Sequence, residues 1–110
     1  MCVVEEVISH SDSFTLSWVF DPALPLFADH FPGNPIVPAF HQLARITEAA
    51  SLWLGIEPAR IRMRGVKFLR PIEPGVLVDL LFSSRSSLIG GAFSLTSGGE
   101  IATQGEFVLV

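Results

Sequence analysis

The 110-residue chain has little of the chemistry that several protein classes require. Its single cysteine, Cys2, excludes an internal disulfide, and we expect this thiol to be inert. Lys and Arg together number only seven, and the net charge of −4 argues against general nucleic-acid binding. No apolar run approaches the ~18 residues that span a bilayer, and no basic segment typical of a signal peptide opens the sequence. These absences favour a cytoplasmic protein without a membrane span.

What the chain does have is an apolar composition, with 49% hydrophobic and only 16% charged residues. Its length suits one domain with one core, residues 1–110, and no repeat or linker divides it. We expect another subunit to cover part of the apolar surface, because obligate interfaces resemble a core cut in half. A generous core in a monomer is the alternative.

Apolar periodicity predicts one helix between groups of strands. The helix is expected over residues 39–54, with Pro38 at its start and Gly55 as its stop. Strands are expected within 3–20, and residues 22–38, which hold five prolines, form an irregular crossing. The strands predicted after the helix are 60–69, 76–83, 88–96 and 101–110. The fold class is therefore α+β, a curved antiparallel sheet around one long helix.

The predicted helix has two distinct faces at 100° per residue. The residues expected to face the core are Ala39, Leu43, Ile46, Ala50, Trp53 and Leu54. Those on the opposite face are His41, Ala44, Arg45, Glu48 and Ser51. Because apolar residues cover more than half of its surface, we expect the sheet to wrap the helix.

The segment from His30 to Pro38 reads His-Phe-Pro-Gly-Asn-Pro-Ile-Val-Pro. Proline fixes φ and removes a backbone donor, whereas glycine opens otherwise forbidden backbone angles. The segment is thus a stiff, shaped loop, and it presents the side chain whose unperturbed pKa lies nearest neutrality. We interpret His30 as a positioned proton-transfer group, with a capping or core histidine as the alternative.

This segment resembles the signature of hot-dog-fold 3-hydroxyacyl-acyl-carrier-protein dehydratases of type II fatty-acid synthesis and of aryl-polyene pigment pathways. Gln42 and Leu43 resemble the pigment-pathway branch. Residues 65–71, followed by Pro74 and Gly75, resemble the family's second marker, a strand leading into a Pro-x-x-Pro-Gly turn. The resemblance implies a hot-dog fold and a 3-hydroxyacyl thioester substrate on the phosphopantetheine of an acyl carrier protein. It also implies an active-site tunnel at a dimer interface, and we expect no cofactor.

The resemblance further implies roles for single residues. His30 removes the α-proton, and the backbone N–H of Ala39 or Phe40 at the helix start binds the thioester oxygen. Elimination of water next to a thioester needs both groups, together with an acid for the departing hydroxyl. The residues expected to bind substrate are Gly33, Pro38, Ala39, Phe40 and His41.

The family's acid comes from the partner subunit's helix and falls here on Ala44, which cannot move a proton. Glu48 lies one turn later on the same face, where the family carries a glutamine, and it could reach the hydroxyl directly or through a water. The alternative for Glu48 is an ion pair with Arg45, and the alternative for His41 is a structural role. A metal site built from His30, His41 and a carboxylate matches no recognised ligand spacing, so none is expected.

Five of the seven cations fall within eleven residues: Arg60, Arg62, Arg64, Lys67 and Arg70. Strand alternation sends the first three to one side and Ile61 and Met63 to the core. We expect this basic stripe to dock an acidic acyl carrier protein, and a charged, exposed edge strand is the alternative.

Three functions remain open. The first, which we favour, is an active dehydratase with His30 as base and relocated or water-assisted acid chemistry. The second is a non-catalytic subunit that pairs with an active homologue, as Ala44 predicts. The third is an acyl-thioester-binding or hydrolysing protein that uses Glu48 as its carboxylate. The expected assembly is a homodimer or higher oligomer, or a heterodimer with a homologous dehydratase.

Overall fold

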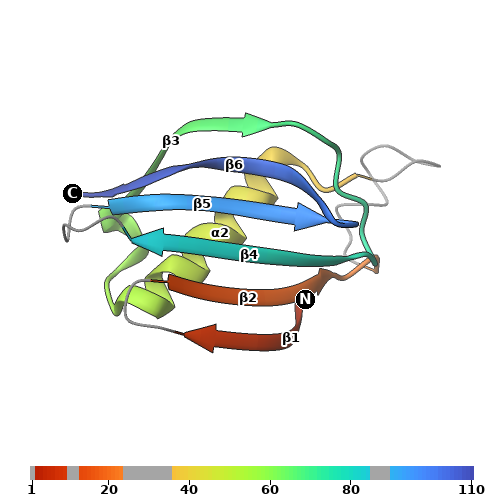
Figure 1. Cartoon of the computed structure of the whole chain (residues 1–110), viewed down its shortest axis with the longest axis horizontal. Helices are drawn as coiled ribbons and strands as arrows, with labels where there is room; N and C mark the ends of the chain where they lie inside the picture. Colours follow the sequence, from red (N-terminus) through yellow and green to blue (C-terminus); the bar gives the residue numbers. More distant parts are fainter. Residues whose placement is uncertain (1, 10–12, 24–35, 85–89) are drawn as a thin grey trace.

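The computed structural model of the chain describes residues 2–9, 13–23, 36–84 and 90–110. Six strands, each antiparallel to its neighbours, form one sheet in the order β1-β2-β4-β5-β6-β3, and a 16-residue helix, α2, lies across one face (Figure 1). The bounds are Cys2–Ser9 (β1), Ser13–Phe20 (β2), Ala39–Leu54 (α2), Pro58–Arg60 (the 3-10 turn η1), Ile61–Phe68 (β3), Leu77–Ser84 (β4), Gly90–Ser97 (β5) and Glu100–Leu109 (β6). The predicted hot-dog arrangement is confirmed.

Most element boundaries agree with the sequence pattern. The helix has the predicted bounds, and Gly55 ends it in the left-handed conformation with φ 68°. Gly98 and Gly99 join β5 to β6 with φ of 61° and 82°, positive values that favour glycine in a two-residue turn. One prediction was wrong: Arg60 belongs to η1 rather than to the strand, because Pro58 begins a 3-10 turn there. Most of the crossing predicted for 22–38 lies outside the described residues.

Aromatic rings fill the space between the sheet and the carboxyl half of α2. The Trp53 ring stacks on the rings of Phe14 and Phe82, with centroids 5.7 and 5.6 Å away. The rings of Phe93 and Phe107 meet Phe82 edge-on, at 6.4 and 5.5 Å. Each of the four buried phenylalanine rings contributes about 1.5–3 kcal/mol through burial, and Trp53 joins the helix to this cluster.

The buried face of α2 differs from the predicted one at four places. Ala39 is exposed, because the first turn stands at the edge of the sheet, whereas Gln42 and Ala49 are buried. Arg45, expected to face outward, has only 10% of its side chain exposed. Its guanidinium carbon lies 4.7 Å from the ring centroid of Trp18, and this cation–π contact draws the side chain inward.

Among the described helices, none has the length and apolar character needed to cross a bilayer.

Candidate active site

A pocket of about 470 Å³ opens at the amino end of α2. We call it the helix-start pocket. One wall is residues 36–39, which lead into the first residue of α2, and the other is residues 68–71, the last residue of β3 and the three that follow it. The lining residues are Ile36, Val37, Pro38, Ala39, Gln42, Phe68, Leu69, Arg70 and Pro71. The walls are mainly apolar, with one guanidinium and one amide among them.

The first turn of α2 leaves backbone donors beside this pocket. Pro38 precedes the helix with an extended backbone (φ −63°, ψ 154°), and no side chain caps the helix start. The Pro38 carbonyl accepts the N–H groups of His41 and Gln42, each at 3.1 Å. The N–H groups of Ala39 and Phe40 have no hydrogen-bond partner among the described residues. Together with the helix dipole, these two donors can stabilise negative charge on a carbonyl oxygen.

His41 and Phe40 do not line the helix-start pocket. The His41 ring packs against Phe20 with centroids 5.4 Å apart, and its Nε2 has no hydrogen-bond partner in the described structure. Burial lowers the pKa of His41 below its usual 6.5, because desolvation disfavours the imidazolium. Phe40 is 64% exposed. Of the predicted substrate-binding residues, the structure thus brings Pro38 and Ala39 to the pocket.

Glu48 and Ala44 lie on the exposed side of α2. The side chain of Glu48 is 66% exposed, and its Oε1 lies 3.2 Å from Nη1 of Arg45, so the predicted ion pair is present. Glu48 follows Gln42 by six residues, about 9 Å along the helix axis, and does not line the helix-start pocket.

His30 and Gly33 lie outside the described residues, and their predicted roles stay predictions. Within the described ranges, no three His, Cys, Asp or Glu side chains gather in a way that would hold a metal ion. The absence of a metal site involving His30 also remains a prediction.

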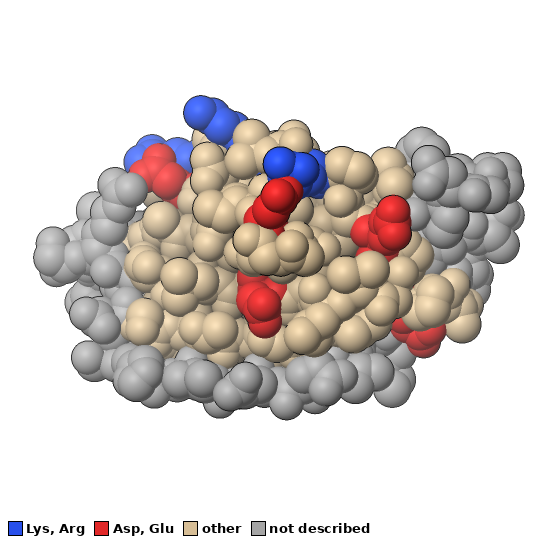
Figure 2. All heavy atoms as spheres, turned by 45° about the vertical axis from the view of Figure 1, so that its right-hand side comes forward, with Lys and Arg blue, Asp and Glu red and all other residues tan. Residues whose placement is uncertain are grey.

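The basic stripe lies along the β3 edge, and all five of its cations are exposed. Figure 2 shows basic side chains gathered towards the top, where Figure 1 draws β3, with acidic ones beside them. Ile61 is buried and Met63 packs on the core, which confirms the predicted alternation. Ion pairs partly neutralise the stripe: Arg64 lies 3.9 Å from Glu106, and Arg70 lies 2.6 Å from Glu100.

The remaining stripe cations differ in how they are held. Nε of Arg60 donates to the carbonyl of Val110 at 2.9 Å. Arg62 and Lys67 form no ion pair with another described residue. These two are the cations most available to an acidic partner.

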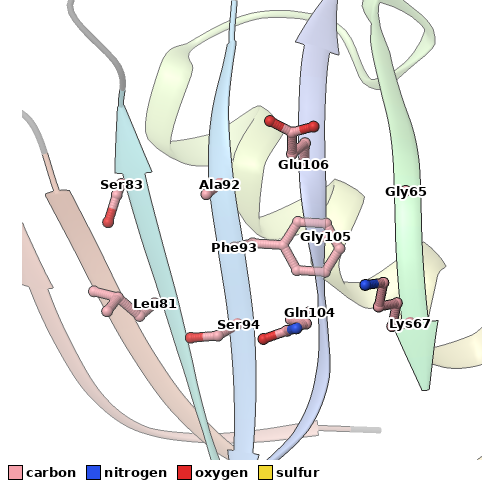
Figure 3. Close-up of a pocket in the computed structure, with 10 residues that line it drawn as sticks. All are labelled: Gly65, Lys67, Leu81, Ser83, Ala92, Phe93, Ser94, Gln104, Gly105 and Glu106. Carbon is pink, nitrogen blue, oxygen red and sulfur yellow. The ribbon is translucent and has the colours of Figure 1, made fainter. Parts of the chain in front are cut away.

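A second hollow, of about 360 Å³, lies on the face of the sheet away from α2 (Figure 3). We call it the outer hollow. Ser94, Gln104 and Lys67 form a row across β5, β6 and β3, and the pairing of the strands places them side by side. β3 bulges just before Lys67, where Gly65 adopts φ 61°. The outer hollow is a depression in the sheet surface with a mixed lining, in which Leu81 and Ala92 stand beside the polar row.

The sequence also matches a known protein family over nearly its whole length. A family model described as ApeI-like, ApeI dehydratase, matches residues 6–106. The chain belongs to the ApeI-like dehydratase family. This ApeI-like chain is similar to the 3-hydroxyacyl-[acyl-carrier-protein] dehydratase FabZ of Chlamydia trachomatis serovar D, with 36% identity over 100 residues, 78% of the chain and 65% of the relative. FabZ of Thermomicrobium roseum is 30% identical over 76% of the chain and 63% of the relative. The chain thus spans less than two thirds of the length of these curated relatives.

Solved structures support the fold. The structure of a dehydratase heterocomplex, ApeI:P from Xenorhabdus doucetiae, matches the present chain with a TM-score of 0.83 and 21% identity. The match covers 99% of the present chain and 97% of the matched chain of that structure. The dehydratase domain from the CurJ module of curacin polyketide synthase matches with a TM-score of 0.78 and 17% identity, covering 98% and 42%. At these identities the likeness establishes the hot-dog fold alone.

Gln42 is a residue of the helix-start pocket that the sequence did not predict as part of the site. Gln42, noted only for its resemblance to the pigment-pathway branch, is 3% exposed and lines the helix-start pocket. Its amide nitrogen donates to the carbonyl of Val37 at 3.0 Å, and its amide oxygen accepts from the hydroxyl of Thr103 at 2.6 Å. The available signal was an amide among apolar residues in the first turns of a helix, because a buried amide needs partners.

Proposed function

We propose that the protein eliminates water from a 3-hydroxyacyl thioester carried on the phosphopantetheine of an acyl carrier protein and releases the trans-2-enoyl thioester. The observation that carries this proposal is the helix-start pocket. This pocket is mainly apolar and lies beside the uncapped N–H groups of the helix start. The last residues of the segment from His30 to Pro38 form part of its lining, and the chain belongs to a dehydratase family.

The proposed reaction has three parts. His30 takes the proton from the carbon next to the thioester. The N–H of Ala39 or Phe40 stabilises the negative charge that develops on the thioester oxygen, which preorganised backbone donors do at no cost of reorganisation. An acid then protonates the hydroxyl on the next carbon. The carbon–oxygen bond breaks, the double bond forms, and water leaves with one proton from the acid.

The acid is the part of the machinery that differs from the family pattern, because Ala44 replaces it. Glu48 is the carboxylate we assign to this role, acting on the pocket of a partner chain. Its 66% exposure and its distance from the helix-start pocket of its own chain support an arrangement in trans. The ion pair with Arg45 holds Glu48 in place at the helix surface.

The site therefore calls for a second subunit, either another copy of this chain or a homologous dehydratase. The ApeI:P structure, a heterocomplex of dehydratases, supports the second arrangement. Ala44 favours one further function for the same assembly, in which this chain is the non-catalytic member and shapes the site of an active homologue.

The basic stripe is the proposed docking surface for the acidic carrier protein, with Arg62 and Lys67 as its unpaired cations among the described residues. Arg70 stands on the wall of the helix-start pocket, where its guanidinium can meet the phosphate of the pantetheine arm. The proposed reaction uses no cofactor, and we propose that it takes place in the cytoplasm.

The test is dehydration of 3-hydroxyacyl carrier proteins of several chain lengths, followed by mass spectrometry. The protein is assayed alone and with a homologous dehydratase. His30→Ala is expected to lower turnover by about 10²–10⁴, and Glu48→Gln by about 10², the usual contributions of a general base and acid. Ala44→Glu, which restores the family's acid, is the matched gain-of-function variant and should rescue Glu48→Gln.

The outcomes separate the candidate functions. Enoyl product from the protein alone, lost in His30→Ala, supports the dehydratase. Product only in the presence of a homologue, unaffected by His30→Ala, supports the non-catalytic subunit. Free acid without enoyl product indicates thioester hydrolysis and contradicts both.

A further inference from the structure

Both walls of the helix-start pocket are fastened to the same short stretch of β6. The wall after β3 is held by its backbone: the N–H groups of Leu69 and Arg70 both donate to the carbonyl of Ala102, at 2.7 and 3.2 Å. Ala102 is fully buried, so solvent does not compete for this carbonyl. One wall of the pocket is thus fixed to the sheet.

The other wall is fastened to the next residue of β6, through a side-chain relay. The hydroxyl of Thr103 donates to the amide oxygen of Gln42, and the amide nitrogen of Gln42 donates to the carbonyl of Val37. The N–H of Val37 donates to the carbonyl of Ile72 at 2.7 Å, which joins this wall to the segment that follows the first. Both backbone groups of Val37, its N–H and its carbonyl, are therefore hydrogen-bonded, and Val37 lies directly before Pro38, the residue that precedes α2.

Packing alone does not require an amide at this position. The other fully buried positions of α2 are Ile46, Ala49 and Ala50, all apolar. Gln42 and Thr103 are 3% and 0% exposed, and each uses its polar atoms on the other or on Val37. A buried amide is tolerated only when it is hydrogen-bonded, and a fully bonded one specifies a single arrangement. The arrangement specified here is the direction in which the chain enters the helix.

We propose that Gln42 and Thr103 are positioning residues of the dehydratase site, an inference that rests on the proposed function. The relay from Thr103 through Gln42 to Val37 fixes the entry into α2. It thereby aims the free N–H groups of Ala39 and Phe40 into the pocket and sets the separation of the two walls. Thr103 does not line the pocket, so its influence on turnover passes through Gln42.

The test combines steady-state kinetics with amide hydrogen exchange measured by NMR. Gln42→Met keeps the length of the side chain and removes both hydrogen bonds. Thr103→Val keeps the shape and removes one, and Thr103→Ser retains the hydroxyl. Ser17→Ala is the matched control, because it removes a hydrogen bond from a buried hydroxyl to Asp79, between β2 and β4 and away from the pocket.

Displaced backbone donors should weaken stabilisation of the transition state more than binding of the substrate. We expect Gln42→Met to lower kcat by about 10- to 100-fold, since displacements near 1 Å have that effect. KM should stay within about threefold. Thr103→Val should also lower kcat, but less than Gln42→Met does, and Thr103→Ser should keep kcat close to wild type. The double variant Gln42→Met/Thr103→Val should have the same kcat as Gln42→Met alone, because both substitutions break the same relay. Exchange of the Val37 amide should quicken about tenfold in Gln42→Met, the factor expected for one lost hydrogen bond.

Either readout can overturn the inference. Wild-type exchange at Val37 in both Gln42→Met and Thr103→Val would show that the relay does not hold this wall, as would equal losses of kcat in Ser17→Ala. If the wild-type protein forms no enoyl product, the proposed function fails, and the exchange data still decide whether the relay holds the wall. Should Gln42→Met not fold, Thr103→Val and Thr103→Ser carry the test.

Discussion

Two hollows of similar size in the described part of the protein differ in what lines them: the helix-start pocket lies at the amino end of α2, and the outer hollow lies on the face of the sheet away from α2. The helix-start pocket, at about 470 Å³, has mainly apolar walls, hydrogen-bonded anchors on β6, and beside it two backbone donors that have no partner among the described residues. The outer hollow, at about 360 Å³, is a row of polar side chains next to a bulge. Volume does not distinguish them.

What distinguishes them is the placement of dipoles that cannot relax. In the helix-start pocket the donors belong to the first turn of a 16-residue helix, whose carboxyl half is locked to the sheet by stacked rings. In the outer hollow the donors are side chains, those of a lysine, an amide and two serines, whose rotatable bonds are not fixed by a helix backbone. Fixed donors stabilise a transition state, whereas mobile ones stabilise every state alike.

The largest expected effect comes from removing one fixed donor from the helix-start pocket. Ala39→Pro deletes the N–H of Ala39, and proline suits this position, because it is the first of the helix and Pro38 already has the extended backbone that a following proline needs. We expect kcat for dehydration to fall by about 10²–10³, as when an oxyanion donor is lost. Circular dichroism and thermal unfolding should stay close to wild type.

The matched control is Ala39→Gly, which keeps the N–H and should keep most of the turnover. Full turnover in Ala39→Pro would assign the donor role to Phe40 alone or dismiss it.

A smaller effect is expected from the outer face, and only with the intact carrier protein. Reversing the charge of Arg62 and Lys67 together should lower kcat/KM for carrier-bound substrate by about tenfold, because surface charges act mainly on the rate of encounter. The loss should shrink as salt is raised, since exposed charges are screened. A short pantetheine thioester should react as in wild type. An equal loss on that small substrate would mean that the outer hollow takes part in the chemistry.

The smallest effect is a pH dependence of stability at the pocket end of α2. His41 is half-buried against Phe20, and desolvation lowers its pKa in the folded state. The unfolded chain therefore binds its proton first, and the free energy of unfolding should fall as the pH drops below about 6.5. Denaturant unfolding of wild type and His41→Gln between pH 7.5 and 5.5 checks this, because the free energy of unfolding of wild type should fall relative to that of His41→Gln towards acid. A constant difference would contradict it.

Local patterns predicted the fold and one end of the site. Pro38 and Gly55 mark the ends of the helix in the sequence, and alternating residues such as Ile61 and Met63 mark the core side of a strand. The uncapped helix start follows from the same reading, because proline supplies no side-chain cap.

Contacts between distant segments explain what sequence periodicity missed. Arg45 was expected outside, since charged residues rarely face a core, yet its guanidinium rests on Trp18, which belongs to a strand 27 residues earlier. The bond from Thr103 to Gln42 spans 61 residues, and no local pattern encodes it. The same holds for the helix-start pocket, whose two walls come from opposite ends of the segment that contains α2 and β3.

Backbone amide NMR of this 110-residue protein tests the central claim most directly. The ligand is a 3-hydroxyacyl pantetheine in which an amide replaces the thioester, so that it binds without reacting. Binding in the helix-start pocket predicts that the largest chemical-shift changes fall on the backbone amides of residues 36, 37, 39–42 and 68–70, which leaves out the two prolines of these walls. Changes concentrated instead on Ser94 and Gln104 of the outer hollow, or no saturable change anywhere, would contradict the account.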